Sequence, residues 1–93
     1  DECAALVALD ISGRPFLNFE KKMSGKIGEF DAELVEEFMR AFAFNAGVNL
    51  YIDLLKGGNM HHEAEAIFKA LAKCVQDAVK IVSDRVPSSK GVL

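Results

Sequence analysis

Hydrophobic residues at the start of the chain fall into short runs that predict strands. A nearly unbroken apolar run at 4–11 predicts a buried strand, and 16–19 predicts a second one. The connecting Ser12-Gly13-Arg14-Pro15 has turn composition. We therefore expect a hairpin with Arg14 at its tip. Residues 26–30 follow a polar stretch and could add a short strand.

A helical pattern begins at Ala32. Asp31 is suited to cap its N-terminus, Glu33 complements the helix dipole in the first turn, and Gly47 is suited to end it. Glu37 lies at the edge of the apolar side rather than opposite it. The residues expected on that side are Leu34, Val35, Phe38, Ala41, Phe42 and Asn45.

The second half of the chain predicts a strand followed by a long helix. Residues 48–54 alternate between apolar even and polar or amphipathic odd positions, which is typical of a strand with one covered face. Gly57-Gly58 turns the chain, and Asn59 is suited to cap a helix that continues to about 85. Residues 86–93 are expected to be extended. The helix is expected to bury Ala64, Ile67, Phe68, Leu71, Val75, Ala78, Val79 and Val82.

The order β-β-α-β-α predicts an α+β fold in a single domain spanning 1–93. We expect a sheet of three to four strands with two helices on one face, leaving the other face open for oligomerisation. Folding at this length buries roughly 60–68% of the unfolded chain's surface, so the domain is marginal unless it associates. A hydrophobic content of 51% also suggests apolar surface for partner contacts.

Composition narrows the functional classes. A net charge of −3 and a pI near 5.3 argue against nucleic-acid binding, because no basic stripe can neutralise phosphates. No transmembrane run or signal peptide is present. Cys3 and Cys74 match no zinc spacing; two reduced thiols in a cytoplasmic protein are favoured, and one disulfide is the alternative. The chain starts at Asp1 and enters an apolar run at once, which indicates part of a longer protein.

The main chemical signal is His61-His62 followed by Glu65 at the start of the second helix. At about 100° per residue, His61 and Glu65 share a face and can hold one metal ion between them. His62 points about 100° away from His61 and would serve a different ion. Nitrogen and oxygen ligands suit Mn, Fe or Zn. The spacing is not that of a zinc protease, and a solvent-exposed histidine pair is the alternative.

Other motifs are weaker. Gly57-Gly58-Asn59 could bind an anion through backbone N–H groups, although a simple turn is favoured. The segment 88–91 could bind phosphate or be only a polar tail. From the pattern alone Glu37 is a solvated carboxylate, and Tyr51 is a packing or interface residue.

Four segments together resemble a known family, and they span essentially the whole chain. In order they are Asp10-Ile11-Ser12-Gly13-Arg14-Pro15, Glu33-Leu34-Val35-Glu36-Glu37-Phe38, Gly58-Asn59-Met60-His61-His62-Glu63-Ala64-Glu65-Ala66-Ile67-Phe68-Lys69-Ala70 and Val86-Pro87-Ser88-Ser89-Lys90-Gly91-Val92-Leu93. They resemble the C-terminal half of imidazoleglycerol-phosphate dehydratases. The resemblance implies the second of two duplicated halves, each similar to ribosomal protein S5 domain 2. It also implies a 24-subunit cytoplasmic assembly with two manganese ions (Mn2+) per complete active site.

The resemblance also implies roles for particular residues. His61 and Glu65 match ligands of one Mn2+, His62 matches a ligand of the other, and Glu37 falls where relatives place a His or Glu ligand. Arg14, Lys69, Ser88 and Lys90 match residues that hold the substrate phosphate. Many relatives carry His where this chain has Tyr51, a position not counted as a ligand.

The implied reaction converts imidazoleglycerol phosphate to imidazole acetol phosphate and water, a step of histidine biosynthesis, with Glu65 moving protons. One half cannot supply all ligands for two ions, so the isolated chain should have little activity without the N-terminal half and neighbouring subunits. The alternative is a non-catalytic, self-associating assembly fragment that binds metal weakly or not at all.

Overall fold

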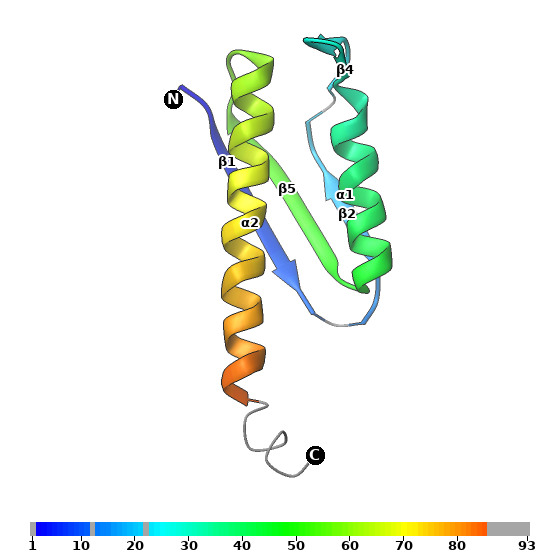
Figure 1. The fold of residues 1–93 in the computed structure, drawn as a ribbon, viewed down its shortest axis with the longest axis vertical. Coiled ribbons are helices and arrows are strands. Elements are labelled where there is room, and N and C mark those ends of the chain that lie inside the picture. The colour runs from blue at the N-terminus through cyan, green and yellow to red at the C-terminus, as the bar shows by residue number, and fades with distance from the viewer. Residues whose placement is uncertain (1, 12, 22, 86–93) are drawn as a thin grey trace.

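A computed structural model describes residues 2–11, 13–21 and 23–85. The elements follow the order β1 (Ala4–Asp10), β2 (Phe16–Phe19), β3 (Lys26–Ile27), β4 (Phe30–Asp31), α1 (Glu33–Ala46), β5 (Asn49–Lys56) and α2 (Met60–Arg85). Both helices lie on one side of a three-stranded sheet and begin at the same end of the molecule (Figure 1). The predicted α+β fold is confirmed. The residues predicted to add a short strand form a separate two-stranded hairpin, β3–β4.

The strand order differs from the predicted hairpin. β5 lies between β1 and β2, pairing antiparallel with β1 and parallel with β2. The prediction that β1 and β2 form a hairpin is therefore wrong. β5 has buried residues in register with both neighbours, since Leu50 stands opposite Leu9 on one side and Leu17 on the other. The turn composition after β1 predicts that the chain reverses direction, but it does not predict which strand pairs with β1.

The sheet has one covered face, as the alternation in β5 predicts. Leu50 and Ile52 are buried beneath the helices, and Tyr51 and Asp53 are exposed on the other face. β1 follows the same alternation. The Tyr51 ring lies 5.9 Å from that of Phe16, centroid to centroid. Together with Leu6, these two rings form an exposed apolar surface that we call the open sheet face.

The buried side of α1 is rotated from the predicted one. Its fully buried residues are Val35, Met39 and Ala43, one helical turn apart. Leu34, Phe38, Ala41 and Asn45, which the sequence places on the apolar side of the helix, are all exposed. The row starting at Val35 is the one that packs into the core against β2 and β5.

The ends of α1 also differ in part from prediction. Gly47 ends the helix in the left-handed conformation, with φ of 67°, as predicted. Asp31 is not the N-cap: Ala32 holds that position without a side-chain hydrogen bond. Asp31 instead belongs to β4 and pairs with the Lys26 Nζ at 2.8 Å. Asp31 therefore stabilises the β3–β4 hairpin, whereas the sequence predicts that it caps α1.

In α2, the buried residues are those near the sheet. Ala64, Ile67 and Leu71 are buried, and Phe68 and Val75 pack partly buried against the core. Val79 is 61% exposed, so its predicted burial is wrong. The helix continues past the end of the sheet there (Figure 1). Val82 lies outside the residues whose side chains are described. Among the described residues, no helix combines the length and apolarity needed to cross a membrane.

Candidate metal centre

The first turn of α2 is held by the predicted cap. The Asn59 side-chain Oδ1 accepts hydrogen bonds from the backbone N–H groups of His61 and His62, at 2.9 and 3.3 Å. The Asn59 carbonyl accepts from the Glu63 N–H at 2.8 Å. The two side-chain bonds satisfy N–H groups that lack partners at a helix start, and the carbonyl bond is the first of the helix itself. They also fix the backbone from which both histidine side chains project.

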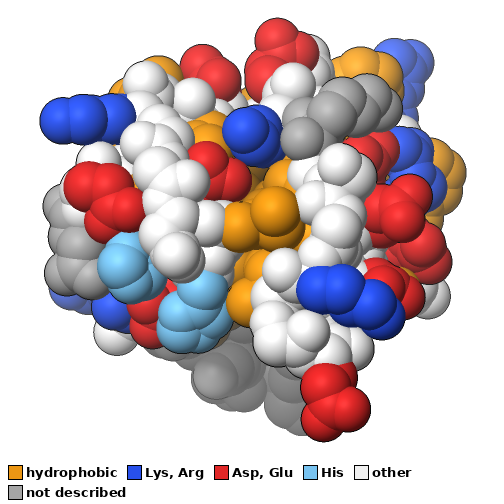
Figure 2. Space-filling view, turned by 90° about the horizontal axis from the view of Figure 1, so that it is seen from above, with side chains coloured by type: hydrophobic (Ala, Val, Ile, Leu, Met, Phe, Trp, Pro, Cys, Tyr) orange, Lys and Arg blue, Asp and Glu red, His pale blue; other side chains and the backbone are white. Residues whose placement is uncertain are grey.

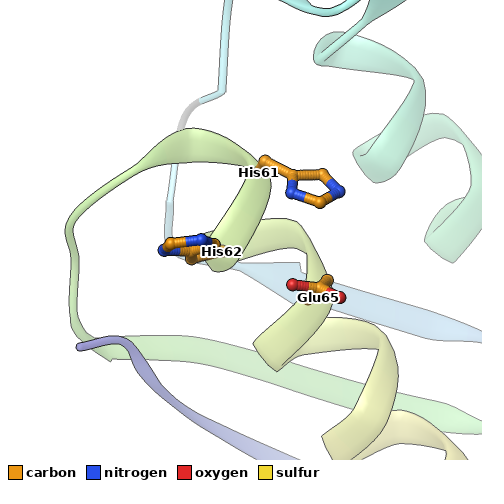
Figure 3. Close-up of side chains that lie close together, drawn as sticks. All are labelled: His61, His62 and Glu65. Carbon is orange, nitrogen blue, oxygen red and sulfur yellow. The ribbon is translucent and has the colours of Figure 1, made fainter. Parts of the chain in front are cut away.

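The two histidines and Glu65 come together at the surface. One possible ligand atom from each of His61, His62 and Glu65 lies within 4.8 Å of the other two. The two rings have centroids 6.1 Å apart, and Glu65 lies one turn further along the helix (Figure 3). The end-on view shows the two rings next to each other with acidic side chains nearby (Figure 2). The structure thus brings the three predicted residues together, and their role as metal ligands stays a prediction.

Two imidazole nitrogens and a carboxylate oxygen form a donor set that suits Mn, Fe or Zn. The atoms are close enough for all three residues to bind one ion. Helix geometry predicts instead that His62 serves a second ion, and that division stays a prediction. In either case, three protein ligands leave coordination positions open for substrate, water or residues from another chain.

Glu2 is a partner of this site that sequence reasoning missed. Its Oε1 lies 2.8 Å from the His62 Nδ1, and its Oε2 accepts a hydrogen bond from the Asn59 N–H at 2.7 Å. The Asn59 N–H, followed by other hydrogen bonds including that to His62, lowers the pKa of Glu2 from 4.5 to about 2. Glu2 stands 60 residues before His62. No local pattern links them, because antiparallel pairing of β1 with β5 brings them together.

Glu63 also holds the loop before α2. It is only 5% exposed, and its Oε2 accepts a hydrogen bond from the Gly58 N–H at 3.0 Å. The Lys21 Nζ lies 3.8 Å from the same oxygen. The N–H groups of Gly58 and Asn59 are thus occupied by the protein's own carboxylates. The structure supports the simple-turn interpretation of this loop over an anion site.

The structure does not bring Glu37 into the histidine group. Glu37 is exposed in the early part of α1, at the end of the fold where α2 also begins (Figure 1). It borders a hollow with Met23, Glu33, Glu36 and Arg40 rather than with the histidines. Its role as a ligand stays a prediction.

Of the residues predicted to bind phosphate, the structure describes Arg14 and Lys69, and only Lys69 lies near the histidines. Lys69 is exposed on α2, four residues after Glu65 and therefore one turn away. Arg14 follows β1, whereas Glu2 precedes it, and seven strand residues span roughly 20 Å. Arg14 is therefore far from its own chain's histidines. Ser88 and Lys90 lie outside the described residues.

His61 also borders an open hollow of about 400 Å³. The hollow lies between the start of α2 and the β3–β4 hairpin. Its lining residues are Lys26, Ile27, Gly28, Asn59, Met60 and His61. A ligand bound at the His61 ring would therefore have space beside it.

The two cysteines are free, as favoured by the sequence. Cys3 precedes β1 and Cys74 lies on α2. Loss of hydration raises the pKa of both thiols, more than any nearby charge does. Neither thiol belongs to the group formed by the two histidines and Glu65.

Comparison with known proteins gives a consistent result. A family model described as imidazoleglycerol-phosphate dehydratase matches residues 1–75. The imidazoleglycerol-phosphate dehydratases of Staphylococcus aureus strains JH9 and N315 are each 55% identical over 95 aligned positions, which cover 100% of this chain and 50% of theirs. The chain thus spans about half the length of these relatives.

Solved structures agree. The crystal structure of imidazoleglycerol-phosphate dehydratase from Staphylococcus aureus N315 superposes with a TM-score of 0.76 at 56% identity, covering 80% of this chain and 44% of that one. The crystal structure of imidazoleglycerol-phosphate dehydratase (IGPD) from Pyrococcus furiosus in complex with (S)-C348 has a TM-score of 0.72 at 33% identity. That match covers 81% of this chain and 43% of the other.

Proposed function

From the premise that the chain belongs to the imidazoleglycerol-phosphate dehydratase family, we propose that it forms one half of a metal-dependent dehydratase. The reaction is removal of water from imidazoleglycerol phosphate to give imidazole acetol phosphate, in histidine biosynthesis. The observation that carries the proposal is the meeting of His61, His62 and Glu65 at one exposed surface. A reaction centre needs such ligands to be open to substrate.

The donor set fits Mn2+: His61 and Glu65 would hold one ion, His62 would be a ligand of the second, and Glu37 would be a further ligand within the assembly. Bound Mn2+ supplies positive charge that stabilises negative charge developing on the substrate. Glu65 is exposed, so its carboxylate can reach a substrate and carry a proton. The histidine rings orient the substrate relative to this carboxylate.

Phosphate binding in this proposal requires more than one chain. Lys69 lies one turn from Glu65 and can serve its own site, whereas Arg14 lies at the other end of β1. Arg14 would then serve the site of a neighbouring subunit, with Ser88 and Lys90 as additional phosphate ligands. Several cations around one dianion would bind it strongly despite the acidic net charge.

The exposed side of the helices supports a partner half. Leu34 and Phe38 on α1 are 41% and 50% exposed, and the Phe38 ring lies 5.3 Å from that of Phe68 on α2. An apolar surface across both helices is suited to packing against another helical layer. We propose the N-terminal half of the enzyme as this partner, within a larger assembly of the 24-subunit type.

Complementation tests the proposal directly. The chain would be refolded together with the N-terminal half of the Staphylococcus aureus relative, Mn2+ would be added, and formation of imidazole acetol phosphate would be measured. We expect turnover from the mixture and little from either piece alone. Absence of turnover, with circular dichroism showing both pieces folded and sedimentation showing a complex, would count against the proposal.

A second function has its own supporting observation, the open sheet face formed by Leu6, Phe16 and Tyr51. Through this face the chain could act as a non-catalytic, self-associating assembly module. Mn2+ titration separates the two functions, since the dehydratase proposal expects His61→Ala to lower the bound metal. Unchanged stoichiometry, together with dimers or trimers in sedimentation, would favour the assembly module.

A further inference from the structure

We propose that Glu2 is a positioning residue that sets which nitrogen of His62 is available to a metal. The inference rests on the proposed metal role of His62. A neutral imidazole carries its proton on one ring nitrogen and can bind a metal only through the other. The Glu2 Oε1, 2.8 Å from the His62 Nδ1, favours the proton on Nδ1. Nε2 is then the nitrogen whose lone pair can be directed at a metal.

Glu2 is oriented for this role by a second bond. Its Oε2 accepts from the Asn59 N–H at 2.7 Å, so both carboxylate oxygens have partners. Asn59 in turn caps the helix turn that carries both histidines. One carboxylate therefore links the backbone of the metal-binding turn to the ring of one ligand. A carboxylate behind a metal-binding histidine fixes the orientation of the ring and raises its basicity.

The space for Glu2 depends on a glycine. A Cβ atom at Gly58 would collide with the Cγ and Oε2 atoms of Glu2. Gly58 is not among the glycines with positive φ, so its backbone conformation does not itself require glycine. We infer that Gly58 leaves room for this carboxylate. Gly58 and Glu2 thus give two independent ways to disturb the same contact.

Glu2 is better placed as a partner of a ligand than as a ligand. It does not belong to the group formed by His61, His62 and Glu65. One of its oxygens is directed at the loop backbone and the other at the Nδ1 of His62. Removing it should therefore alter His62 without removing a metal donor.

The first test uses Glu2→Gln. The amide oxygen of glutamine can still accept from the Asn59 N–H, which places the NH2 group toward the His62 Nδ1. An NH2 donor favours the opposite tautomer, with the proton on Nε2. We expect the Mn2+ affinity to fall by roughly 10–100-fold, as is typical when a metal-binding histidine loses its hydrogen-bond partner. Titration calorimetry would measure the affinity.

The second readout needs no metal. Nitrogen-15 NMR of the metal-free protein, at a pH where the imidazoles are neutral, distinguishes the two tautomers of His62. We expect the Nδ1–H form in the starting protein and a shift toward Nε2–H in Glu2→Gln. A residue that only stabilised the loop would not change this tautomer.

Gly58→Ala should also weaken Mn2+ affinity, because the added Cβ displaces the Glu2 side chain without changing its chemistry. The matched control is Asp10→Asn, which removes the same charge at the opposite end of β1. It should change Mn2+ affinity less than twofold. An unchanged His62 tautomer in Glu2→Gln would overturn the inference, as would an equal loss of affinity in Asp10→Asn.

His62→Ala separates failure of this inference from failure of the proposed function. If His62→Ala binds Mn2+ as tightly as the starting protein, the metal role of His62 is wrong. If His62→Ala weakens binding and Glu2→Gln does not, only the role of Glu2 is overturned.

Discussion

The buried carboxylate of Glu63 accepts a hydrogen bond from the Gly58 N–H at 3.0 Å, joining the second helix to the loop that precedes it. A Cβ at Gly57 would lie 2.7 Å from the same Glu63 oxygen, so the loop backbone and this side chain are closely packed. The position of the histidines depends on this loop. Glu63, which binds nothing in the proposed reaction, is therefore important for the site.

Glu63→Ala should destabilise the fold by about 1–3 kcal/mol, because it removes the hydrogen bond between the Gly58 N–H and a charged carboxylate. Lys21→Met is the comparison variant. It removes a cation that lies 3.8 Å from the Glu63 carboxylate. Because the Lys21 side chain is 40% exposed, we expect the free energy of unfolding to fall by only about 0–1 kcal/mol. Urea unfolding followed by circular dichroism measures both. Equal costs for the two variants would show that the ion pair, not the loop bond, is the important interaction.

Asn59→Ala should lower the free energy of unfolding by about 0.5–2 kcal/mol, because the His61 and His62 N–H groups lose their acceptor. Asn59→Asp keeps an acceptor oxygen at the cap and should be close to the starting protein. Thermal unfolding of the three proteins tests this. If Asn59→Asp lowers the stability as much as Asn59→Ala does, the side chain of Asn59 does not stabilise the fold by capping the helix.

Stability should depend on pH through Glu2. Its pKa of about 2 in the folded protein lies below the ordinary 4.5, so the folded state favours the ionised carboxylate. The contribution of Glu2 should be complete above about pH 4.5 and disappear as the pH falls toward 2. The comparison is the free energy of unfolding of the metal-free protein and of Glu2→Gln between pH 2 and 6. The difference should shrink over the acid part of this range; a difference that stays constant would contradict the prediction.

Gly47→Ala should destabilise the fold by about 1–2 kcal/mol, because position 47 has a φ of 67° that disfavours any side chain. Space is not the cause, since the nearest atom to a Cβ there is the Gly13 carbonyl oxygen at 3.7 Å. Ala46→Gly, at the last helical position, is a control for flexibility at the same helix end. Chemical denaturation would measure both. A negligible cost for Gly47→Ala would mean that the helix can end differently.

Features that depend on neighbours in sequence could be predicted. The cap at Asn59 and the stop at Gly47 arise within one helical turn. The alternation of β5 and the grouping of His61 and Glu65 follow from the repeat of each element. Prediction from local sequence was wrong where one residue suits two elements. Asp31 suits a helix N-cap, but in the structure it belongs to the β3–β4 hairpin and pairs with Lys26.

The sequence by itself therefore determined the type of each main element and the turn that carries the metal-ligand residues, because helix and strand periodicity are local properties. Only the tertiary structure decided the place of β5 between β1 and β2, the buried row of α1 and the contact between Glu2 and His62. These depend on which surfaces meet once the chain is packed. Residues 60 positions apart become neighbours only through the pairing of strands, and no spacing along the chain encodes that.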